Sequence, residues 1–201
     1  MVLNEKKTKV MIFNFSKNSQ FTTDIKLKGE SLEVVDEAKL LGTIITSDMK
    51  WNANTKRIVQ NANSKMRMLH LASKFVKDKN DLKHIYKTFI RSRLEFSCEL
   101  WHSSLSKTNE TDIERVQKSA LKVILKNKYK DYESALKLLD MESLYERRSN
   151  LCLKFAKKCL RIENFKKLFP HKKTKHDMKK RNVEKILINN IVTETCENPH
   201  G

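Results

Sequence analysis

The chain has 201 residues, of which 42 are Lys or Arg and 24 are Asp or Glu, giving a formal net charge of +18 and a pI near 9.8. Such an excess of basic residues indicates a polyanionic partner. The sequence has only 3 glycines. They are too few and too scattered for a glycine-rich phosphate loop, which excludes the dinucleotide-binding and P-loop classes of enzyme.

The sequence also predicts an intracellular protein of the nucleus or cytoplasm, with no membrane partner. No apolar run is long enough to span a bilayer, and the N-terminus lacks the apolar core of a signal peptide. The four cysteines are scattered and form no C-x-x-C pair, which favours a reducing compartment. We expect no metal site, because the remaining candidate ligands lack the spacing of a familiar zinc finger. These ligands are His171, His176, Cys196 and His200.

The first 48 residues predict a small antiparallel β-sheet. The candidate strands are residues 9–15, 21–28, 32–35 and 38–46. They alternate in hydropathy or are rich in β-branched residues, and the stretch around Gly29 supplies the turn of a hairpin. Gly42 interrupts the last apolar strand and indicates a β-bulge or a close approach of the backbone.

Beyond residue 50 the apolar period becomes helical and predicts a bundle of about five helices. The first two apolar stripes consist of Ile58, Ala62, Met66, Leu69 and Val76, and of Leu82, Ile85, Tyr86, Phe89 and Ile90. Thr111 and Glu114 have capping-box spacing in front of a third helix, Asp131 is a candidate N-cap for a short fourth helix, and Ser143 precedes a long fifth one. The predicted fold class is therefore α+β, mostly α.

The basic charge lies after the strand segment. Residues 1–50 carry 8 basic and 7 acidic side chains, whereas residues 51–169 carry 27 basic and 13 acidic ones. We therefore divide the chain into a strand segment (1–48), a helical domain (49–169), and a basic, partly mobile C-terminal tail (170–201).

Several short blocks occur in a distinctive order. They are Leu-Asn-Glu-Lys-Lys-Thr-Lys-Val-Met-Ile-Phe at 3–13, Lys-Leu-Leu-Gly-Thr-Ile-Ile at 39–45, Met-Lys-Trp at 49–51, Ile-Tyr-Lys-Thr-Phe-Ile-Arg-Ser at 85–92, Leu-Glu-Phe at 94–96, Ile-Glu-Arg-Val-Gln-Lys-Ser-Ala-Leu at 113–121 and Leu-Tyr-Glu-Arg-Arg at 144–148. Together they resemble reverse transcriptases of non-LTR (LINE-type) retrotransposons, from the end of the palm through the thumb to the helices that follow. The resemblance covers roughly residues 3–170. One departure is Asn54, where the family often has a histidine.

The resemblance implies a polymerase region without its catalytic metals. The family's carboxylates, which hold two Mg²⁺ ions for in-line displacement, come from strands upstream of these blocks. The one adjacent acidic pair here, Asp36-Glu37, lies on the polar approach to a strand of a different block, so we expect this chain alone to hold no cofactor and not to polymerise. A lysine at the position of Lys7 lies near the incoming triphosphate in the family. The alternative is that Lys7 and its neighbours are solvated charges on an edge strand.

Eight basic residues on or beside the first two helices are candidate phosphate contacts: Lys56, Arg57, Lys65, Arg67, Lys74, Lys77, Arg91 and Arg93. A thumb-like helix that tracks an RNA/DNA duplex contacts phosphates without reading bases. The alternative is an ordinary solvated face. Trp51 and Trp101 could stack on bases, but Trp101 ends an apolar helix and is expected to be buried. Leu41 and Gly42 resemble the palm hairpin that grips the primer end, with a plain bulge as the alternative.

These observations predict a reverse-transcriptase fragment that binds primer-template without sequence preference and without its own catalysis. One alternative is a domesticated helical module that binds an acidic protein. Another is a polymerase part that an upstream palm fragment completes in trans. A third is the product of a decayed element that has no function.

Overall fold

The computed structural model describes residues 8–14 and 24–166. By internal contacts the chain divides into two units, residues 1–144 and 145–201. The fold is α+β and mostly α, which confirms the predicted class. None of the helices in the described ranges combines the length and the apolar composition needed to cross a bilayer. Lys7, the candidate zinc ligands and the predicted tail (170–201) lie outside the described residues.

Over residues 8–14 and 24–46, the strand segment forms separate two-stranded ladders rather than one antiparallel sheet. The first four strands are β1 (Lys9–Val10), β2 (Lys26–Leu27), β3 (Glu30–Ser31) and β4 (Glu33–Val34). β1 pairs with β4 in parallel, and β2 pairs with β3 in an antiparallel hairpin. Lys28 and Gly29 form its turn, both with positive φ (51° and 94°), as a two-residue turn requires. A hairpin at Gly29 is confirmed, but its returning strand is β3, which lies within the predicted turn. The predicted returning strand, residues 32–35, contains β4, which pairs with β1 instead.

The last two strands correct the sequence-based prediction. β5 (Glu37–Leu40) and β6 (Thr43–Thr46) pair antiparallel, with Leu40 opposite Thr43. Leu41 and Gly42 therefore form a tight turn, with φ values of 46° and 90°, and the predicted bulge within one strand is wrong. Gly42 supplies the freedom that such a turn needs, whereas a leucine with positive φ is uncommon.

The helical elements are α1 (Asn52–Phe75), α2 (Lys79–Ile85), the π-helix η2 (Tyr86–Arg91), α3 (Ser92–Leu94), α4 (Cys98–Trp101), the 3₁₀-helix η3 (His102–Ser104), α5 (Lys107–Leu125), the 3₁₀-helix η4 (Lys126–Lys128), α6 (Tyr132–Leu138), α7 (Leu144–Leu160) and α8 (Glu163–Lys166). The predicted helices correspond to α1, to α2 with η2, and to α5, α6 and α7. The short helices α4 and α8 are not among the predicted ones.

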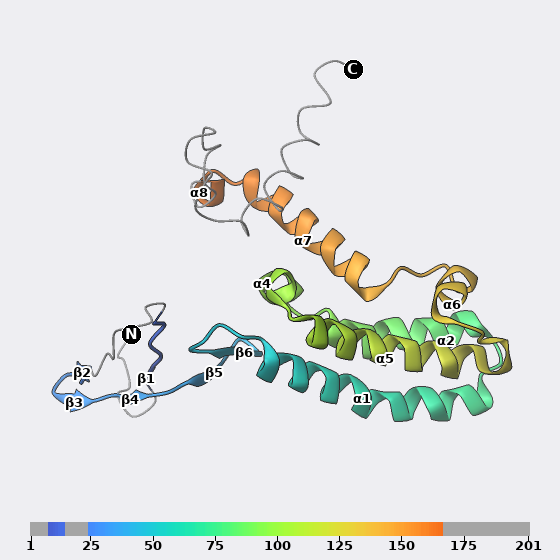
Figure 1. The fold of residues 1–201 in the computed structure, drawn as a ribbon, viewed down its shortest axis with the longest axis horizontal. Helices are drawn as coiled ribbons and strands as arrows, with labels where there is room; N and C mark the ends of the chain where they lie inside the picture. The colour runs from blue at the N-terminus through green and yellow to red at the C-terminus, as the bar shows by residue number, and fades with distance from the viewer. Residues whose placement is uncertain (1–7, 15–23, 167–201) are drawn as a thin grey trace, which may run out of the picture. The chain divides into compact units, whose positions relative to one another are not determined.

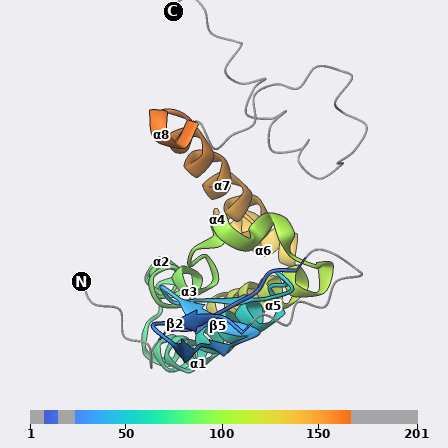
Figure 2. The ribbon, with the colours of Figure 1, turned by 90° about the vertical axis from the view of Figure 1, so that its left-hand side faces the viewer.

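Helices α1, α2 and α5 lie side by side in the first unit and enclose its core (Figures 1 and 2). Fully buried apolar side chains include Ala62, Leu69, Tyr86, Ile90, Trp101, Ile113 and Leu121. Near the starts of α1 and α5, Asn109 Nδ2 donates a hydrogen bond to Asn52 Oδ1 at 2.8 Å. Near their ends, Lys126 Nζ donates to the Ser73 carbonyl at 2.5 Å. The two long helices therefore run parallel.

The helix starts match the prediction in two cases out of three. Asp131 caps α6, because its carboxylate accepts the Ser134 N–H at 2.9 Å, and α7 begins directly after Ser143. The predicted capping box of the third helix is wrong. Ser106 caps α5 instead, and its hydroxyl accepts the Asn109 N–H at 3.2 Å. Thr111 therefore lies inside the helix.

A buried polar network joins η2, α5 and α6. The Tyr86 hydroxyl donates to Gln117 Oε1 at 2.5 Å, and Gln117 Nε2 donates to the Tyr132 hydroxyl at 2.9 Å and to the Glu142 carbonyl at 3.0 Å. The Tyr132 hydroxyl donates to Glu114. Burial raises the pKa of both tyrosines, so both remain neutral donors at ordinary pH.

Candidate nucleic-acid interface

Helix α1, which carries most of the predicted phosphate contacts, has basic but no acidic side chains. Its 24 residues contain five Lys or Arg and not one Asp or Glu. The apolar side of α1 packs into the core, where Ile58, Ala62, Met66 and Leu69 are buried as predicted. The basic side chains are therefore restricted to the remaining faces of the helix.

Three of the predicted contacts share one exposed face of α1. At about 100° per residue, Lys56, Arg67 and Lys74 lie within about 20° of one another, on the side away from the core. They span about 27 Å along the axis at about 1.5 Å per residue. Gln60 and Asn63 are exposed between them. In the described part of the chain none of the three cations makes an ion pair, so their charge is available to a ligand. We call this surface the α1 basic face.

Two further predicted contacts, Lys65 and Arg93, are exposed but lie elsewhere. Lys65 projects from α1 about 160–180° away from the three cations of the α1 basic face. Arg93 lies in the short helix α3. A rod-like ligand seated on the α1 basic face is therefore out of reach of Lys65.

Lys77 follows α1 and lines a pocket of about 440 Å³. Lys79, Lys83 and the aspartates 78 and 140 lie around the same pocket. Lys83 Nζ donates to the Leu139 carbonyl at 2.6 Å, so one of these lysines already caps the end of α6. The mixed charge of the pocket gives it no clear preference for an anion.

Arg57 has a structural partner rather than a free surface position. Its guanidinium donates a hydrogen bond to the Gly42 carbonyl at the turn between β5 and β6, and the side chain is half-buried. One turn earlier, Asn54 Oδ1 accepts the Ile44 N–H at 3.2 Å, and Asn54 is buried. Both residues fasten the hairpin to α1.

Arg91 also interacts with a side chain of the protein itself. Its Nε lies 3.6 Å from Glu95 Oε1, one helical turn later, and the two side chains are only 15% and 12% exposed. A guanidinium that is paired with a carboxylate and mostly shielded from solvent attracts a phosphate only weakly. Arg91 is therefore not part of the α1 basic face.

The tip of the β5–β6 hairpin combines two unfavourable features. Leu41 is 92% exposed and has φ of 46°, a conformation that costs about 1–2 kcal/mol for an L-residue. Gly42 lies against Phe96, since a Cβ built on it would be 3.2 Å from the Phe96 ring. Of the two residues predicted to grip a primer, Leu41 is exposed at the tip, whereas Gly42, the one predicted to approach the sugar-phosphate closely, packs against Phe96.

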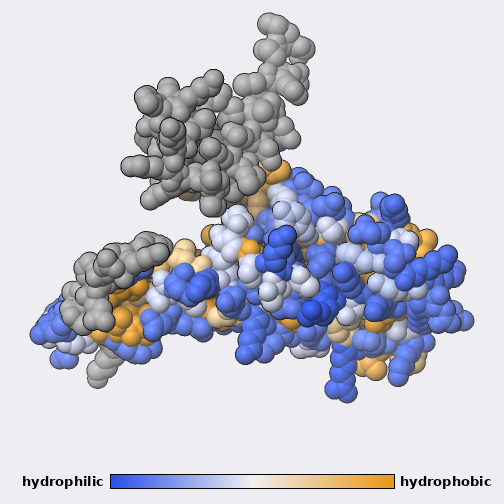
Figure 3. Space-filling view, viewed as in Figure 1, coloured by the Kyte–Doolittle hydropathy of each residue, from blue (hydrophilic) through white to orange (hydrophobic). Residues whose placement is uncertain are grey.

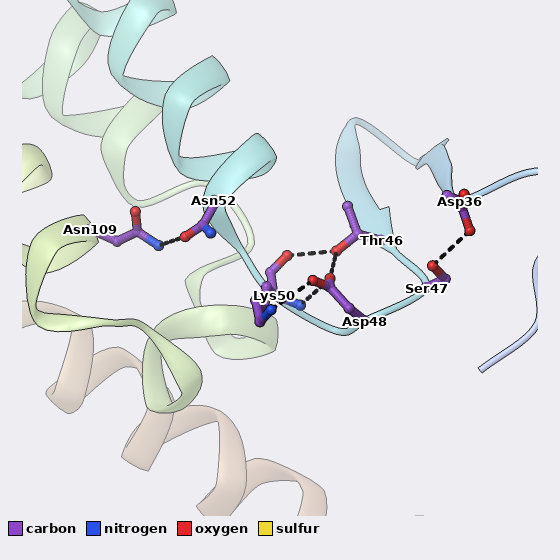
Figure 4. A network of polar contacts seen from close by, with 7 residues as sticks. All are labelled: Asp36, Thr46, Ser47, Asp48, Lys50, Asn52 and Asn109. Carbon is purple, nitrogen blue, oxygen red and sulfur yellow. Dashed lines mark hydrogen bonds and ion pairs between the residues drawn. The ribbon is translucent and has the colours of Figure 1, made fainter. Parts of the chain in front are cut away.

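The junction between β6 and α1 is held by a network of polar contacts (Figure 4). The Thr46 hydroxyl lies 2.7 Å from both Asp48 Oδ1 and the Lys50 carbonyl oxygen, and Asp48 Oδ1 accepts the Lys50 N–H at 3.0 Å. Ser47 donates to Asp36 Oδ1 at 3.0 Å. The hydrogen bond from Thr46 is the main cause that lowers the pKa of Asp48 to about 2.

The two tryptophans do not form a stacking platform. Trp51 is 6% exposed and Trp101 is fully buried, with its Nε1–H donating to the Phe96 carbonyl at 3.1 Å. The expectation that Trp101 is buried is confirmed. Hydrophilic side chains cover most of the visible face over α1 and α5 (Figure 3). The lysines of α5 are not among the phosphate contacts predicted from the sequence.

Comparison of the chain with models of known protein families, with curated proteins and with solved structures finds no match. The class that the fold defines is an α+β protein whose long basic helix is fastened to a β-hairpin. The resemblance to non-LTR reverse transcriptases rests on the sequence blocks alone.

Proposed function

We propose that the chain binds a nucleic-acid duplex without sequence preference, through phosphate contacts from Lys56, Arg67 and Lys74. The observation that carries the proposal is the α1 basic face, a row of exposed cations about 27 Å long on a helix without a carboxylate. Lysine and arginine side chains on one helix face fix a protein on a duplex through its backbone and carry no base information.

We further propose that the binding unit derives from the palm end and thumb of a non-LTR reverse transcriptase. The ordered sequence blocks support this origin. The fastening of the β5–β6 hairpin to α1 by Arg57 and Asn54 supports a rigid unit in which the tip at Leu41 and the α1 basic face meet one ligand. The exposure and strain of Leu41 are explained if the tip contacts the primer strand.

The proposal gives this chain no polymerase activity of its own. In-line nucleotidyl transfer requires carboxylates that hold two divalent cations. In the described ranges no group of three His, Cys, Asp or Glu side chains is placed to hold a metal ion. Catalysis would require the family's metal-binding carboxylates, supplied for example by an upstream palm fragment, and Mg²⁺.

The test is a fluorescence-anisotropy titration of the full chain against a labelled RNA/DNA hybrid at several salt concentrations. Removing one cation that binds a phosphate lowers the slope of log K against log salt by about 1, so the triple variant K56Q/R67Q/K74Q should lower it by about 3. Affinity should fall equally for hybrids of unrelated sequence.

The matched control is K65Q/K107Q/K137Q, which removes the same charge from exposed lysines off the α1 basic face. This control should change the slope of log K against log salt by less than about 1, because it reduces the long-range electrostatic attraction but removes no phosphate contact. Equal reductions in the two triple variants, or no binding by the natural chain at low salt, would refute the proposed interface.

A second candidate function is a helical module that binds an acidic protein. Phe75 is 82% exposed and Leu71 49% exposed, one helical turn apart and flanked by Arg67 and Lys74. An apolar pair with basic neighbours fits an acidic amphipathic segment. Nuclease-resistant capture of an acidic protein that F75A abolishes and K56Q leaves unchanged would favour this candidate.

A further inference from the structure

A second basic surface lies on the other long helix and is distinct from the α1 basic face. Between residues 118 and 130 the chain has five lysines and no Asp or Glu. All five lysines are exposed: Lys118, Lys122, Lys126, Lys128 and Lys130. They extend from the second half of α5 through η4 to the residue before the N-cap of α6.

Two of these lysines are held by aromatic rings. Lys118 Nζ lies 4.9 Å from the centre of the Tyr132 ring, and Lys122 Nζ lies 5.5 Å from the centre of the Tyr129 ring. A cation–π contact places an ammonium group without neutralising it, in contrast to an ion pair. The two lysines are one helical turn apart, so their charges add on one face of α5.

The nearby carboxylates have other partners. Asp112 forms an ion pair with Arg115 at 2.7 Å. Glu114 accepts hydrogen bonds from the Tyr132 hydroxyl and from the Leu144 N–H, and Asp131 caps α6. The exposed Glu133 is the acidic side chain of α6 nearest to this surface in the sequence. Hydrogen bonds from Ser134 lower the pKa of Asp131, and the adjacent Lys130 helps to lower it, so part of the Lys130 charge is compensated. In the described ranges Lys118, Lys122 and Lys128 form no ion pair, and their charge remains available.

The backbone path is fixed where the lysines leave the helix. Lys126 has φ of 51° and ψ of −125°, an uncommon conformation for a residue with a side chain, and its Nζ donates to the Ser73 carbonyl of α1. This hydrogen bond anchors the end of α5. Lys128 and Lys130 then flank the half-buried Tyr129, so that cations and an aromatic ring alternate along the loop.

We propose that Lys118, Lys122, Lys128, Lys130 and Tyr129 form a second binding surface, which takes single-stranded nucleic acid. Lysines that alternate with an aromatic ring suit a ligand that offers both phosphates and unpaired bases. In a duplex the phosphates are accessible, but the bases are stacked inside and cannot reach the Tyr129 ring. An acidic peptide has no bases to stack on that ring. The chain would then hold a duplex on α1 and a single strand on α5.

The test compares a labelled single-stranded oligonucleotide with a blunt hybrid duplex, both titrated by anisotropy into the full chain. K118Q/K122Q should weaken single-strand binding about tenfold at low salt, and it should leave duplex binding within about twofold. Y129A should weaken single-strand binding roughly tenfold, because it removes the ring on which a base stacks, whereas Y129F should retain it. K107Q/K137Q, which removes the same charge, is the control.

The two proposals fail separately in this design. K56Q/R67Q/K74Q should weaken the duplex and leave the single strand, which is the reverse of K118Q/K122Q. Single-strand binding that is indifferent to Y129A, or that polyglutamate competes for as well as an oligonucleotide does, would overturn the second surface. Circular-dichroism melting of each variant distinguishes an unfolded variant from a folded one that binds weakly.

Discussion

Replacing Gln117 by leucine should destabilise the first unit more than any single change at the binding surfaces. The Gln117 side chain is fully buried and its amide makes three hydrogen bonds, with the Tyr86 hydroxyl, the Tyr132 hydroxyl and the Glu142 carbonyl. Leucine has a similar volume but no polar atoms. The substitution therefore removes all three hydrogen bonds without opening a large cavity.

The expected cost is about 3 kcal/mol of unfolding free energy. Each net hydrogen bond contributes about 0.5–1.5 kcal/mol, and a buried hydroxyl left without a partner costs about 1–3 kcal/mol. Tyr86 is fully buried and would be left in that state, whereas Tyr132 keeps its hydrogen bond to Glu114. Tyr86→Phe alone should cost about 1–2 kcal/mol. The double variant should cost about 1–2 kcal/mol less than the sum of the single ones, because the orphaned hydroxyl is then gone.

Urea unfolding followed by tryptophan fluorescence measures these values, since Trp51 and Trp101 are both buried in the folded chain. Ser119→Ala is the control on the same helix. Its exposed hydroxyl only donates to the Arg115 carbonyl at 3.0 Å, and the change should stay within about 0.5 kcal/mol. A cost below about 1 kcal/mol for Gln117→Leu, or strict additivity with Tyr86→Phe, would refute the network as a source of stability.

Three further predictions concern the hairpin and its junction with α1. Leu41→Asn should raise stability by about 0.5–1 kcal/mol, because asparagine tolerates positive φ, and should weaken binding of the RNA/DNA hybrid; unchanged affinity would count against contact at the tip. Gly42→Ala should cost about 1–2 kcal/mol in urea unfolding, since the new Cβ meets the Phe96 ring at 3.2 Å with φ of 90°. Asp48 has a folded-state pKa of about 2, below its ordinary value of 3.8, so its stabilising effect is complete above about pH 4 and is lost as the pH falls toward 2. The difference in melting temperature between Asp48→Asn and the natural chain should therefore shrink over that range, and a difference independent of pH would contradict the assignment.

Local signals in the sequence were sufficient where the deciding contact is local. The period of Ile58, Ala62, Met66 and Leu69 predicted the buried side of α1, and Asp131 predicted the start of α6. Gly29 predicted a hairpin because its partners lie within a few residues.

The sequence was insufficient where a distant group decides. Glu114 has capping-box spacing, but its carboxylate is taken by Tyr132, which lies 18 residues later. Arg57 has the pattern of a surface cation, yet it binds the carbonyl of Gly42, 15 residues earlier. Helical periodicity places a side chain on a face but does not reveal the partner that the fold brings to it, so the pattern predicts Arg57 as a phosphate contact.

The parallel direction of α1 and α5 determines how the protein must fold. Parallel helices cannot be joined by a short turn, and here residues 76–106 make the return crossing, so Asn52 meets Asn109 across a separation of 57 residues. Helix α1 has no packing partner of comparable length until α5 has been synthesised. Without α5, the apolar stripe of α1 would be exposed to solvent. A single proteolytic cut within residues 76–106 should therefore loosen the α1 basic face as well as the core, although none of its three cations lies in that segment.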